Sequence, residues 1–176
     1  MILLALAIVV VVAGLLLLPI RWPDALVGSR IVESISIDAT PERIFDYVAT
    51  PANWPHWHPA SRGVRGVAGR PLAIGDRVVE TFEVGGRTNE ATWTMVELER
   101  PLRWRIVAEG RGGGGADIRY RIDAGADAVR FERDLRYRGP NLVFGILNAL
   151  RIDNIMRRDS AQALANIKRY VEGRVA

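Results

Sequence analysis

The sequence predicts an α+β domain in which an antiparallel β-sheet is covered on one face by a long C-terminal helix. Segments between residues 31 and 136 alternate apolar and charged side chains, which is typical of antiparallel strands buried on one face only. Residues 141–173 instead carry an apolar stripe at helical spacing. The first twenty residues contain no charged side chain, so we expect them to form an element separate from this domain.

Residues 1–20 are long enough to cross a bilayer, because a helix of this length extends about 30 Å. A cleavable signal peptide would have a basic start and a small-residue cleavage site, and neither is present. We therefore expect a single-pass transmembrane anchor at residues 1–20, a juxtamembrane tether at 21–29 and a ligand-binding domain at 30–176. Arg21 and Arg30 follow the apolar run, so the positive-inside rule places this domain in the cytoplasm.

The stretch from residue 31 to residue 60 predicts a strand, one amphipathic helix and an aromatic-rich turn. Thr40 has the position of a helix N-cap, and Pro41 and Glu42 suit the first turn that follows it. The apolar faces of the strand and helix contain Ile35, Ile37, Ile44, Phe45 and Val48. Residues 53–59, NWPHWHP, contain too many prolines to continue the helix, so we expect a turn there.

Six further segments have the alternating pattern of strands. They cover residues 61–69, 76–84, 87–99, 102–108, 117–122 and 129–136. Gly85 and Gly86 mark a tight hairpin turn between two of them. Residues 112–115 are all glycine and join two strands, and they lack the Lys and Ser/Thr of a phosphate-binding loop.

The C-terminal helix is expected to run from about residue 141 to residue 173, with Pro140 at its entry and Gly173 near its end. Its second half has an apolar stripe of Met156, Ser160, Ala163, Leu164, Ile167 and Val171. The small members of that stripe allow close packing on a sheet. The first half, LVFGILNAL at residues 142–150, is apolar nearly all round. It is either buried at one end of the interior or placed against a membrane, and we expect burial.

Three motifs carry a resemblance to a known family: ATPERIFDYV at residues 39–48, NWPHWHP at 53–59 and ALANIKRYVEG at 163–173. Together they resemble the START/polyketide-cyclase superfamily, also called SRPBCC proteins, over about residues 30–173. Its members include pollen allergens, lipid-transfer domains and polyketide cyclases. The resemblance implies the helix-grip fold, in which a curved antiparallel sheet wraps around a long C-terminal helix. It also implies a cavity between sheet and helix for an apolar or amphipathic ligand.

The candidate ligand-pocket residues lie on the predicted apolar faces of the strands and in the aromatic-rich turn, which supplies Trp54 and Trp57. The aromatic ones are Trp54, Trp57, Phe82, Trp93, Trp104, Tyr120 and Phe131. Any one of them could simply fill the core, and the resemblance is what favours a pocket. Glu80 and Arg133 also fall in phase with the apolar side chains of their strands. A buried charge is costly unless it is paired, so these two residues either satisfy each other, orient a polar ligand group, or reach water at a bulge or sheet margin.

Composition and motifs exclude several kinds of chemistry. The chain has 24 basic residues, all arginine except Lys168, against 20 acidic ones. They are scattered along the predicted elements without a nucleic-acid motif, so we expect solvated faces, with an anionic membrane surface as the second possibility. The absence of Cys excludes thiolate catalysis, disulfides and Cys-based metal sites. His56 and His58 lack a third ligand nearby, so we expect a polar rim on the pocket and neither a metal nor a cofactor.

Three functions fit these observations. The first is a membrane-anchored binding or carrier domain for a hydrophobic small molecule, such as a lipid, an isoprenoid or a polyketide-like compound. The second is an enzyme of the cyclase/dehydratase type, whose candidate acid–base groups are His56, Glu80, Tyr120 and Arg133. The third is a co-chaperone-like interaction module, which would expose an apolar patch and have no sizeable cavity. We take the first as the working interpretation.

Overall fold

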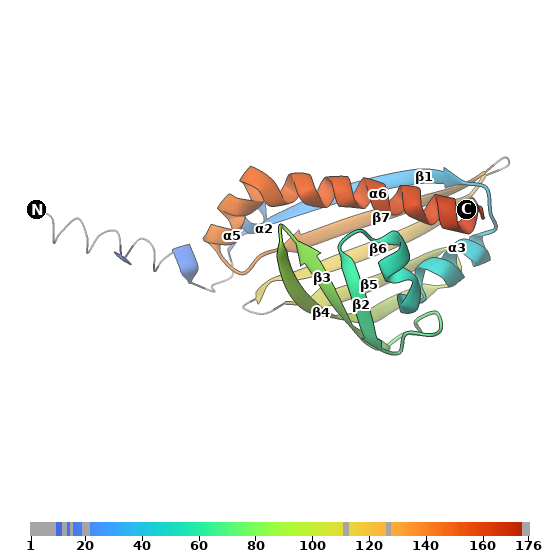
Figure 1. Ribbon diagram of the computed structural model, residues 1–176, viewed down its shortest axis with the longest axis horizontal. Coiled ribbons are helices and arrows are strands. Elements are labelled where there is room, and N and C mark those ends of the chain that lie inside the picture. Colours follow the sequence, from blue (N-terminus) through green and yellow to red (C-terminus); the bar gives the residue numbers. More distant parts are fainter. Residues whose placement is uncertain are drawn as a thin grey trace, which may run out of the picture.

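A single antiparallel sheet forms the body of the domain in the computed structural model (Figure 1), which describes residues 10, 11, 14, 16–18, 22–110, 113–125 and 128–173. In the described residues the sheet has seven strands in the order β1-β7-β6-β5-β4-β3-β2. The strands are β1 (Gly28–Ile37), β2 (Ser61–Gly66), β3 (Arg77–Val84), β4 (Arg87–Glu99), β5 (Arg103–Glu109), β6 (Gly115–Ala124) and β7 (Val129–Arg138). Each strand from β2 to β7 pairs with its neighbour in sequence, and β1 pairs with β7 at one edge.

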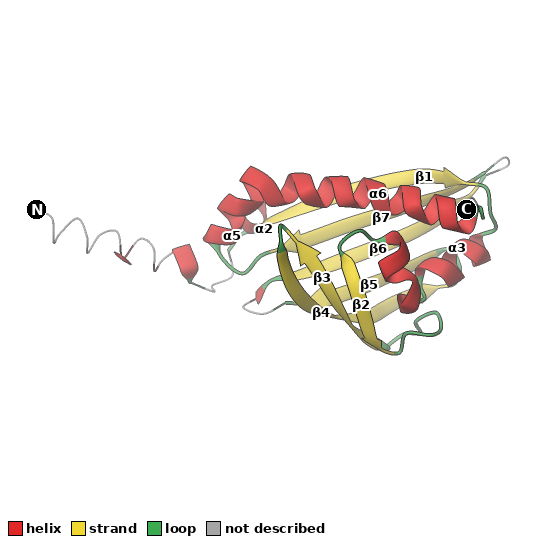
Figure 2. Ribbon diagram, in the orientation of Figure 1, coloured by secondary structure: helices red, strands yellow, loops and turns green. Residues whose placement is uncertain are grey.

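Helices cover one face of this sheet. Figure 2 shows the long helix α6 (Asp153–Val171) running along the sheet, with α3 (Pro41–Val48) near its C-terminal end and α2 (Asp24–Val27) and α5 (Leu142–Leu147) near its N-terminal end. From residue 22 onward the described helices are, in chain order, α2 (Asp24–Val27), α3 (Pro41–Val48), a 3₁₀ turn (Pro51–Asn53), α4 (Trp54–Trp57), α5 (Leu142–Leu147), a π-helical turn (Asn148–Ile152) and α6 (Asp153–Val171). The curved sheet and the long C-terminal helix confirm the predicted helix-grip fold.

The start of α3 is as the sequence predicts, whereas the aromatic-rich turn is more regular than expected. The Thr40 hydroxyl accepts a hydrogen bond from the Arg43 backbone N–H at 3.3 Å, and Pro41 begins the helix. The aromatic-rich segment does not stay irregular, because Trp54–Trp57 forms the short helix α4. Pro55 is tolerated there since it lies in the first turn, where a backbone N–H has no intrahelical partner.

One strand changes face along its length. The register of β4 against β5 shifts between Met95 and Glu97, where one extra residue forms a β-bulge. As a result Leu98 lies opposite Trp104 and packs against the core. Simple alternation along this strand would place Leu98 on the face opposite Trp93, but the bulge reverses the phase of every later residue.

The segment 142–150 is the other clear departure from expectation. A π-helical turn between α5 and α6 contains one more residue than an α-helical turn, which rotates α5 by about one position relative to α6. Gly145 and Asn148 consequently face the domain. The exposed apolar side chains of this segment are Ile146 (52% exposed), Leu147 (45%) and Leu150 (73%). The predicted burial of this segment is therefore wrong for these three residues.

The second half of the C-terminal helix packs as predicted. The buried residues of α6 are Ser160, Ala163, Leu164, Ile167 and Val171. The helix also crosses the edge strand β1, where the Lys168 ammonium donates a hydrogen bond to the Ser36 carbonyl at 2.6 Å. The Arg157 guanidinium makes a longer contact of 3.4 Å with the Arg30 carbonyl of the same strand. These contacts fix α6 against both the interior and the edge of the sheet.

The structure describes part of the predicted anchor and most of the predicted tether. Most of residues 1–20 lie outside the described residues, and the described ones at 10, 11, 14, 16 and 17 are helical. Among the described residues, no helix combines the length and the hydrophobicity that crossing a membrane requires. The expected tether is structured where it is described, because α2 occupies residues 24–27 and β1 begins at Gly28. Val27 is fully buried, which ties this segment to the domain.

We expect Gly145→Ala to destabilise the protein by about 1–3 kcal/mol, because an added methyl group would collide with the backbone carbonyl of Leu26 on α2. Gly69→Ala is the matched control, since nothing lies within 4 Å of its added methyl group. Urea unfolding measures both variants. Equal midpoints for the two variants would show that α5 does not pack on α2 as described.

Candidate functional site

A small cavity lies between the sheet and the helices. Its volume is about 30 Å³, which is enough to admit a water molecule or a small polar group. The residues that line it are Trp54, Trp57, His58, Glu80, Trp93, Ile106, Ile118, Tyr120 and Arg133. They come from α4, from the residue that follows it and from five different strands. Two of them, Glu80 and Arg133, have an acidic and a basic side chain in a wall that is otherwise aromatic or aliphatic.

Glu80 and Arg133 are both buried, at 6% and 2% exposure. The Trp93 indole N–H donates a hydrogen bond to Glu80 Oε2 at 2.7 Å, and Arg133 Nη1 donates one to Ser160 Oγ at 2.8 Å. The two charged groups are not within 4.0 Å of each other as an ion pair, among the residues that the structure describes. They face a common cavity and interact across it. Neither reaches water at a bulge or at the sheet margin.

Burial shifts the protonation equilibria of three groups around the cavity. It raises the pKa of Glu80, against the opposing effects of its hydrogen bonds and of Arg133. It also raises the pKa of Tyr120. Burial, and secondly the positive charge of Arg133, lower the pKa of His58 to about 3. Although part of the His58 residue remains exposed, its Nδ1 atom is fully buried, so the neutral imidazole is the stable form.

Three nitrogen atoms of cavity-lining residues have no hydrogen-bond partner within the described part of the chain. They are Trp57 Nε1, His58 Nδ1 and Arg133 Nε, and each is buried. Buried polar groups normally have partners, because leaving one without a partner costs about 1–3 kcal/mol. The cavity therefore offers unused hydrogen-bonding capacity to a polar group that enters it.

A layer of stacked aromatic rings extends from this cavity. Tyr120 stacks on Trp104 with ring centroids 4.8 Å apart and on Phe131 at 5.9 Å. Trp104 in turn meets the ring of Phe45 edge-to-face at 5.1 Å. This layer connects the charged cavity to helix α3, which carries Phe45.

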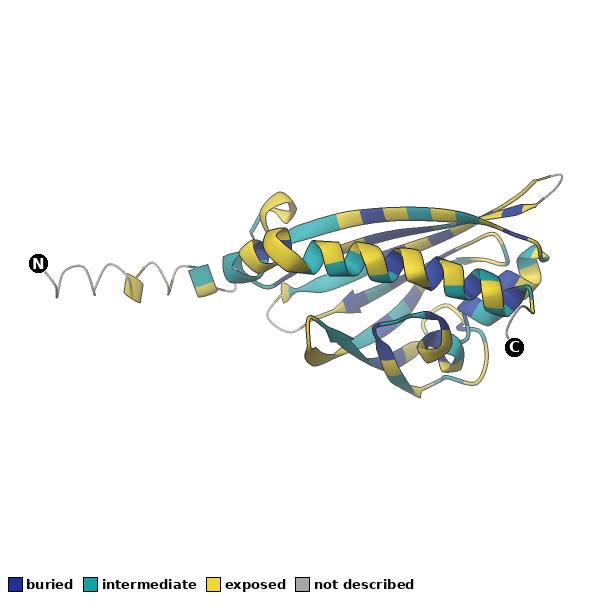
Figure 3. Cartoon of the chain, turned by 45° about the horizontal axis from the view of Figure 1, so that its top comes forward, coloured by how far each residue is buried: buried dark blue, intermediate teal, exposed yellow. Residues whose placement is uncertain are grey.

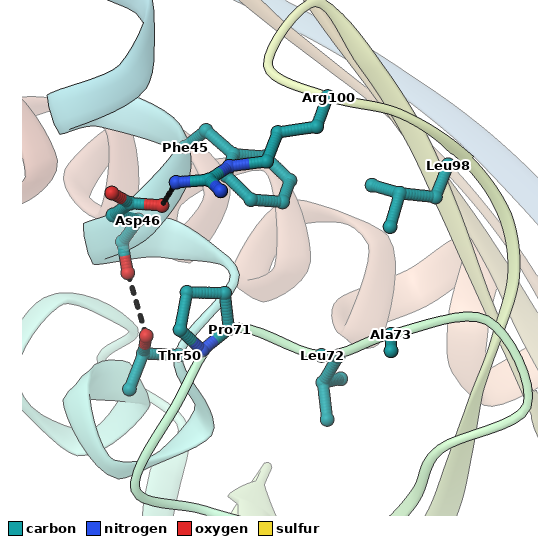
Figure 4. A pocket seen from close by; sticks show the side chains of 8 residues that line it. All are labelled: Phe45, Asp46, Thr50, Pro71, Leu72, Ala73, Leu98 and Arg100. Carbon is teal, nitrogen blue, oxygen red and sulfur yellow. Dashed lines mark hydrogen bonds and ion pairs between the residues drawn. The ribbon is translucent and has the colours of Figure 1, made fainter.

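Phe45 is also part of the wall of a larger groove on the surface (Figure 4), with a volume of about 450 Å³. The groove is lined by Phe45, Asp46, Thr50, Pro71, Leu72, Ala73, Leu98 and Arg100. Arg100 forms an ion pair with Asp46 at 2.7 Å, and its guanidinium lies over the Phe45 ring, 5.4 Å from the centroid. The volume falls within the usual range of small-molecule sites, whereas that of the inner cavity does not.

The structure brings together some of the predicted pocket residues and not others. Trp54, Trp57, Glu80, Trp93, Tyr120 and Arg133 line the inner cavity. Trp104 and Phe131 are buried in the aromatic layer beside it. Phe82 is only half-buried and lies opposite Ser61 of β2, outside the core cluster. No ligand contact tests these assignments, so the role of each residue in binding stays a prediction.

Sequence reasoning missed the groove altogether. Simple alternation assigns Leu98 to the other face of the sheet, because the bulge in β4 has no signature in the sequence. Leu72 and Ala73 lie in a loop without periodicity, although Leu72 is only 2% exposed. The sequence does contain a signal for the contact between Arg133 and Ser160. Ser160 is the one polar member of the predicted apolar stripe of α6, which indicates a polar partner on the facing sheet.

His56 and His58 do not converge on one point. His56 is exposed and lies near the ring of Tyr170 at 6.1 Å, whereas His58 packs against Trp57 and the inner cavity. Among the described residues, no group of three or more His, Cys, Asp or Glu side chains is arranged to hold a metal ion.

We expect Arg133→Met to destabilise the protein by about 3–5 kcal/mol, because it leaves Glu80 buried without the opposing charge. Adding Glu80→Gln should recover part of this loss, since the double variant buries no charge at the cavity. Arg103→Met is the control; its side chain is 64% exposed, and we expect a change within about 0.5 kcal/mol. Urea unfolding of the wild type, Arg133→Met, Glu80→Gln and the double variant measures the coupling, and additive losses would show that Glu80 and Arg133 act independently.

We also expect the neutral His58 to make stability pH-dependent. Its pKa is about 3 in the folded protein and 6.5 in the reference state, so between these values the unfolded chain binds a proton that the folded protein does not. This contribution is fully present above about pH 6.5 and is lost as the pH falls towards about 3.

His58→Gln should therefore reduce the dependence of unfolding free energy on pH by up to about 1.4 kcal/mol per pH unit in that window. The raised pKa of Glu80 changes stability with pH in the opposite direction. Both proteins contain Glu80, so its contribution largely cancels when their pH profiles are compared. Urea unfolding at several pH values is the measurement. Parallel curves for the two proteins would contradict a neutral buried imidazole.

Several solved structures are similar to this fold. The crystal structure of TTHA0849 from Thermus thermophilus has a TM-score of 0.69 at 15% identity, covering 84% of this chain and 100% of that chain. The NMR structure of KanY (ms6282) has a TM-score of 0.64 at 14% identity, covering 82% and 98%. Ginseng major latex-like protein 151 from Panax ginseng has a TM-score of 0.62 at 10% identity, covering 82% and 97%. Likeness at these identities shows the fold alone.

No curated protein sequence matches the chain significantly. One family model does match, and its description is polyketide cyclase / dehydrase and lipid transport. The match spans residues 29–172, from the first strand to the end of the C-terminal helix, and so contains both the cavity and the groove. The chain therefore belongs to the polyketide cyclase/dehydrase and lipid transport family.

Proposed function

We propose that this protein is a binding or carrier domain for a hydrophobic small molecule that has a polar end. The observation that carries the proposal is the continuous aromatic layer from the 450 Å³ groove to the charged inner cavity. The groove supplies volume and apolar walls, and the cavity supplies polar partners. Family membership supports the same class of ligand, because its description includes lipid transport.

In this arrangement the apolar body of the ligand lies in the groove against Phe45, Leu72 and Leu98. The inner cavity is too small for a lipid or a polyketide-like compound, so a longer ligand enters the interior only if rings of the aromatic layer move. The Arg100–Asp46 ion pair lies over Phe45 at the groove and is solvent-exposed, so opening it costs little. A hydroxyl, carbonyl or carboxyl group at the ligand's inner end would then meet the free nitrogens of His58 and Arg133.

The proposal includes attachment to a membrane through the apolar residues 1–20, with the domain on the cytoplasmic side. Its support is the length of the uncharged run and the position of Arg21 directly after it. Membrane attachment suits a carrier of hydrophobic molecules, because the ligand's reservoir is then the adjacent bilayer.

A second candidate function is proton-transfer catalysis of the cyclase/dehydratase type. The observation that favours it is the raised pKa of Glu80 in a cavity that also contains Tyr120 and His58. A carboxyl group with a raised pKa is a suitable general acid or base near neutral pH. Of the four acid–base candidates predicted from the sequence, Glu80, Tyr120 and Arg133 line the cavity, whereas His56 is exposed on α4 and does not.

We expect the full-length protein, purified from its own host, to carry a hydrophobic compound in stoichiometric amount. Native mass spectrometry followed by lipid extraction measures it. Leu98→Glu should remove most of the bound compound by placing a charge in the groove. Leu102→Glu is the matched control, because Leu102 is 37% exposed and does not line the groove. A protein that is empty as purified, and that binds no lipid or quinone from a panel, would rule out the carrier function.

The bound compound then separates the two candidate functions. Incubation with the purified protein leaves a carried ligand unchanged, whereas an enzyme converts it. If conversion occurs, Glu80→Gln should abolish it while leaving binding intact, because the amide keeps the shape of the side chain and loses its acid–base capacity.

A further inference from the structure

The unassigned feature that stands out is an exposed apolar surface at the end of the domain nearest the N-terminal segment. We call it the α2–α5 surface, and it consists of Leu26, Ile146, Leu147 and Leu150. Figure 1 shows α2 and α5 side by side at this end, and Figure 3 shows exposed positions on the ribbon there. Each of the four side chains is between 45% and 73% exposed. Clustered large apolar side chains on a surface usually mark a site of interaction.

The π-helical turn and the contacts beside it direct the apolar side chains of α5 away from the domain. If the α-helical spacing of α6 continued back through residue 146, Ile146 would fall in line with the buried stripe of Ile167 and Val171. The π-helical turn moves Gly145 and Asn148 into that position instead. Asn148 is then fixed by two hydrogen bonds, from the Tyr137 hydroxyl at 2.8 Å and to Ser29 Oγ at 2.9 Å. Ile146, Leu147 and Leu150 are therefore exposed because Asn148 and Gly145 occupy the buried positions.

The surface is continuous with the apolar N-terminal segment. The Arg138 guanidinium donates a hydrogen bond to the Trp22 carbonyl at 2.8 Å and pairs with Asp24, which places Trp22 beside α2. The described residues of the segment are apolar and exposed as well, with Val10 at 63%, Val11 at 60% and Leu17 at 56%. Trp22 joins the two, and Trp is a residue type enriched at membrane–water interfaces.

The charges around this surface are positive or neutralised. Asp24 pairs with Arg138 at 3.0 Å, and Asp153 pairs with Arg157 at 2.7 Å. Arg151, in the π-helical turn beside Leu150, is exposed and forms no ion pair with any described residue. An apolar surface flanked by free guanidinium charge is complementary to anionic lipid headgroups over an acyl layer.

We propose that the α2–α5 surface docks on an anionic lipid bilayer, with Ile146, Leu147 and Leu150 in the headgroup–acyl boundary and Arg151 among the headgroups. The proposal rests on the proposed function in one respect: membrane attachment through residues 1–20 keeps the bilayer close to the domain. It goes beyond attachment because it gives the domain one fixed orientation. A bilayer fits better than a second copy of the chain, since the surface adjoins the uncharged run of residues 1–20 and carries unpaired positive charge.

The test uses the full chain, which contains no native Cys, so that a single introduced Cys gives one labelled position. Leu150→Cys carries an environment-sensitive fluorophore on the α2–α5 surface, and Leu147→Cys is a second position on it. Ile74→Cys is the control; it is apolar and 64% exposed, in the loop before β3 at the other end of the domain. The proteins are reconstituted in phosphatidylcholine vesicles with or without phosphatidylglycerol, and a nitroxide on the lipid acyl chain is the quencher.

We expect emission from positions 150 and 147 to shift to shorter wavelength and to be quenched, while position 74 remains unchanged. Arg151→Gln in the Leu150→Cys background should reduce quenching more in vesicles with phosphatidylglycerol than in those without it. Vesicle association without quenching at 150 and 147 would overturn the docking surface while leaving membrane attachment intact. Absence of vesicle association would overturn both. Energy transfer between labelled copies at position 150, without lipid quenching, would assign the surface to self-association and overturn the proposal.

Discussion

Burial of the Arg133 guanidinium beneath α6 is the constraint on which the interior depends. Arg133 comes from the middle of β7, which lies between β1 and β6, and its side chain points towards the helix rather than to water. The hydrogen bond to Ser160 requires a small polar residue on the helix at that level. The Arg133 charge also sets the electrostatic environment of Glu80, Tyr120 and His58, whose protonation all responds to it. The Arg133 side chain therefore affects both the stability of the fold and the polar groups that the cavity offers to a ligand.

The groove and the α2–α5 surface lie at opposite ends of the domain. The groove lies between α3, the loop before β3 and the end of β4, and α5 lies at the opposite end of the sheet (Figure 1). In the proposed orientation the α5 end faces lipid and the groove faces away from it. The aromatic layer from Phe45 to Tyr120 then lies between the groove and the charged cavity.

Regular alternation made most of the sheet predictable from the sequence, because each strand has one buried face. The same alternation revealed Glu80 and Arg133, since a charge in phase with apolar neighbours is detectable by counting. The β-bulge after Met95 and the π-helical turn at Asn148 escaped this reasoning. Each inserts one residue into a periodic element, and each reverses or rotates the faces of what lies beyond it. The groove and the α2–α5 surface both depend on these insertions, which is why neither could be found from periodicity.

The contacts of α6 with the edge strand β1 limit the capacity of that edge to pair with another strand. An open sheet exposes unpaired backbone groups along its outer strands, and these can recruit strands from other molecules. At this edge Lys168, the chain's single lysine, occupies the carbonyl of Ser36, and Arg157 approaches that of Arg30. At the far edge, β2 is short and carries the exposed charges of Arg62 and Arg65. Basic side chains thus cover or flank both margins of the sheet, which opposes edge-to-edge pairing between molecules.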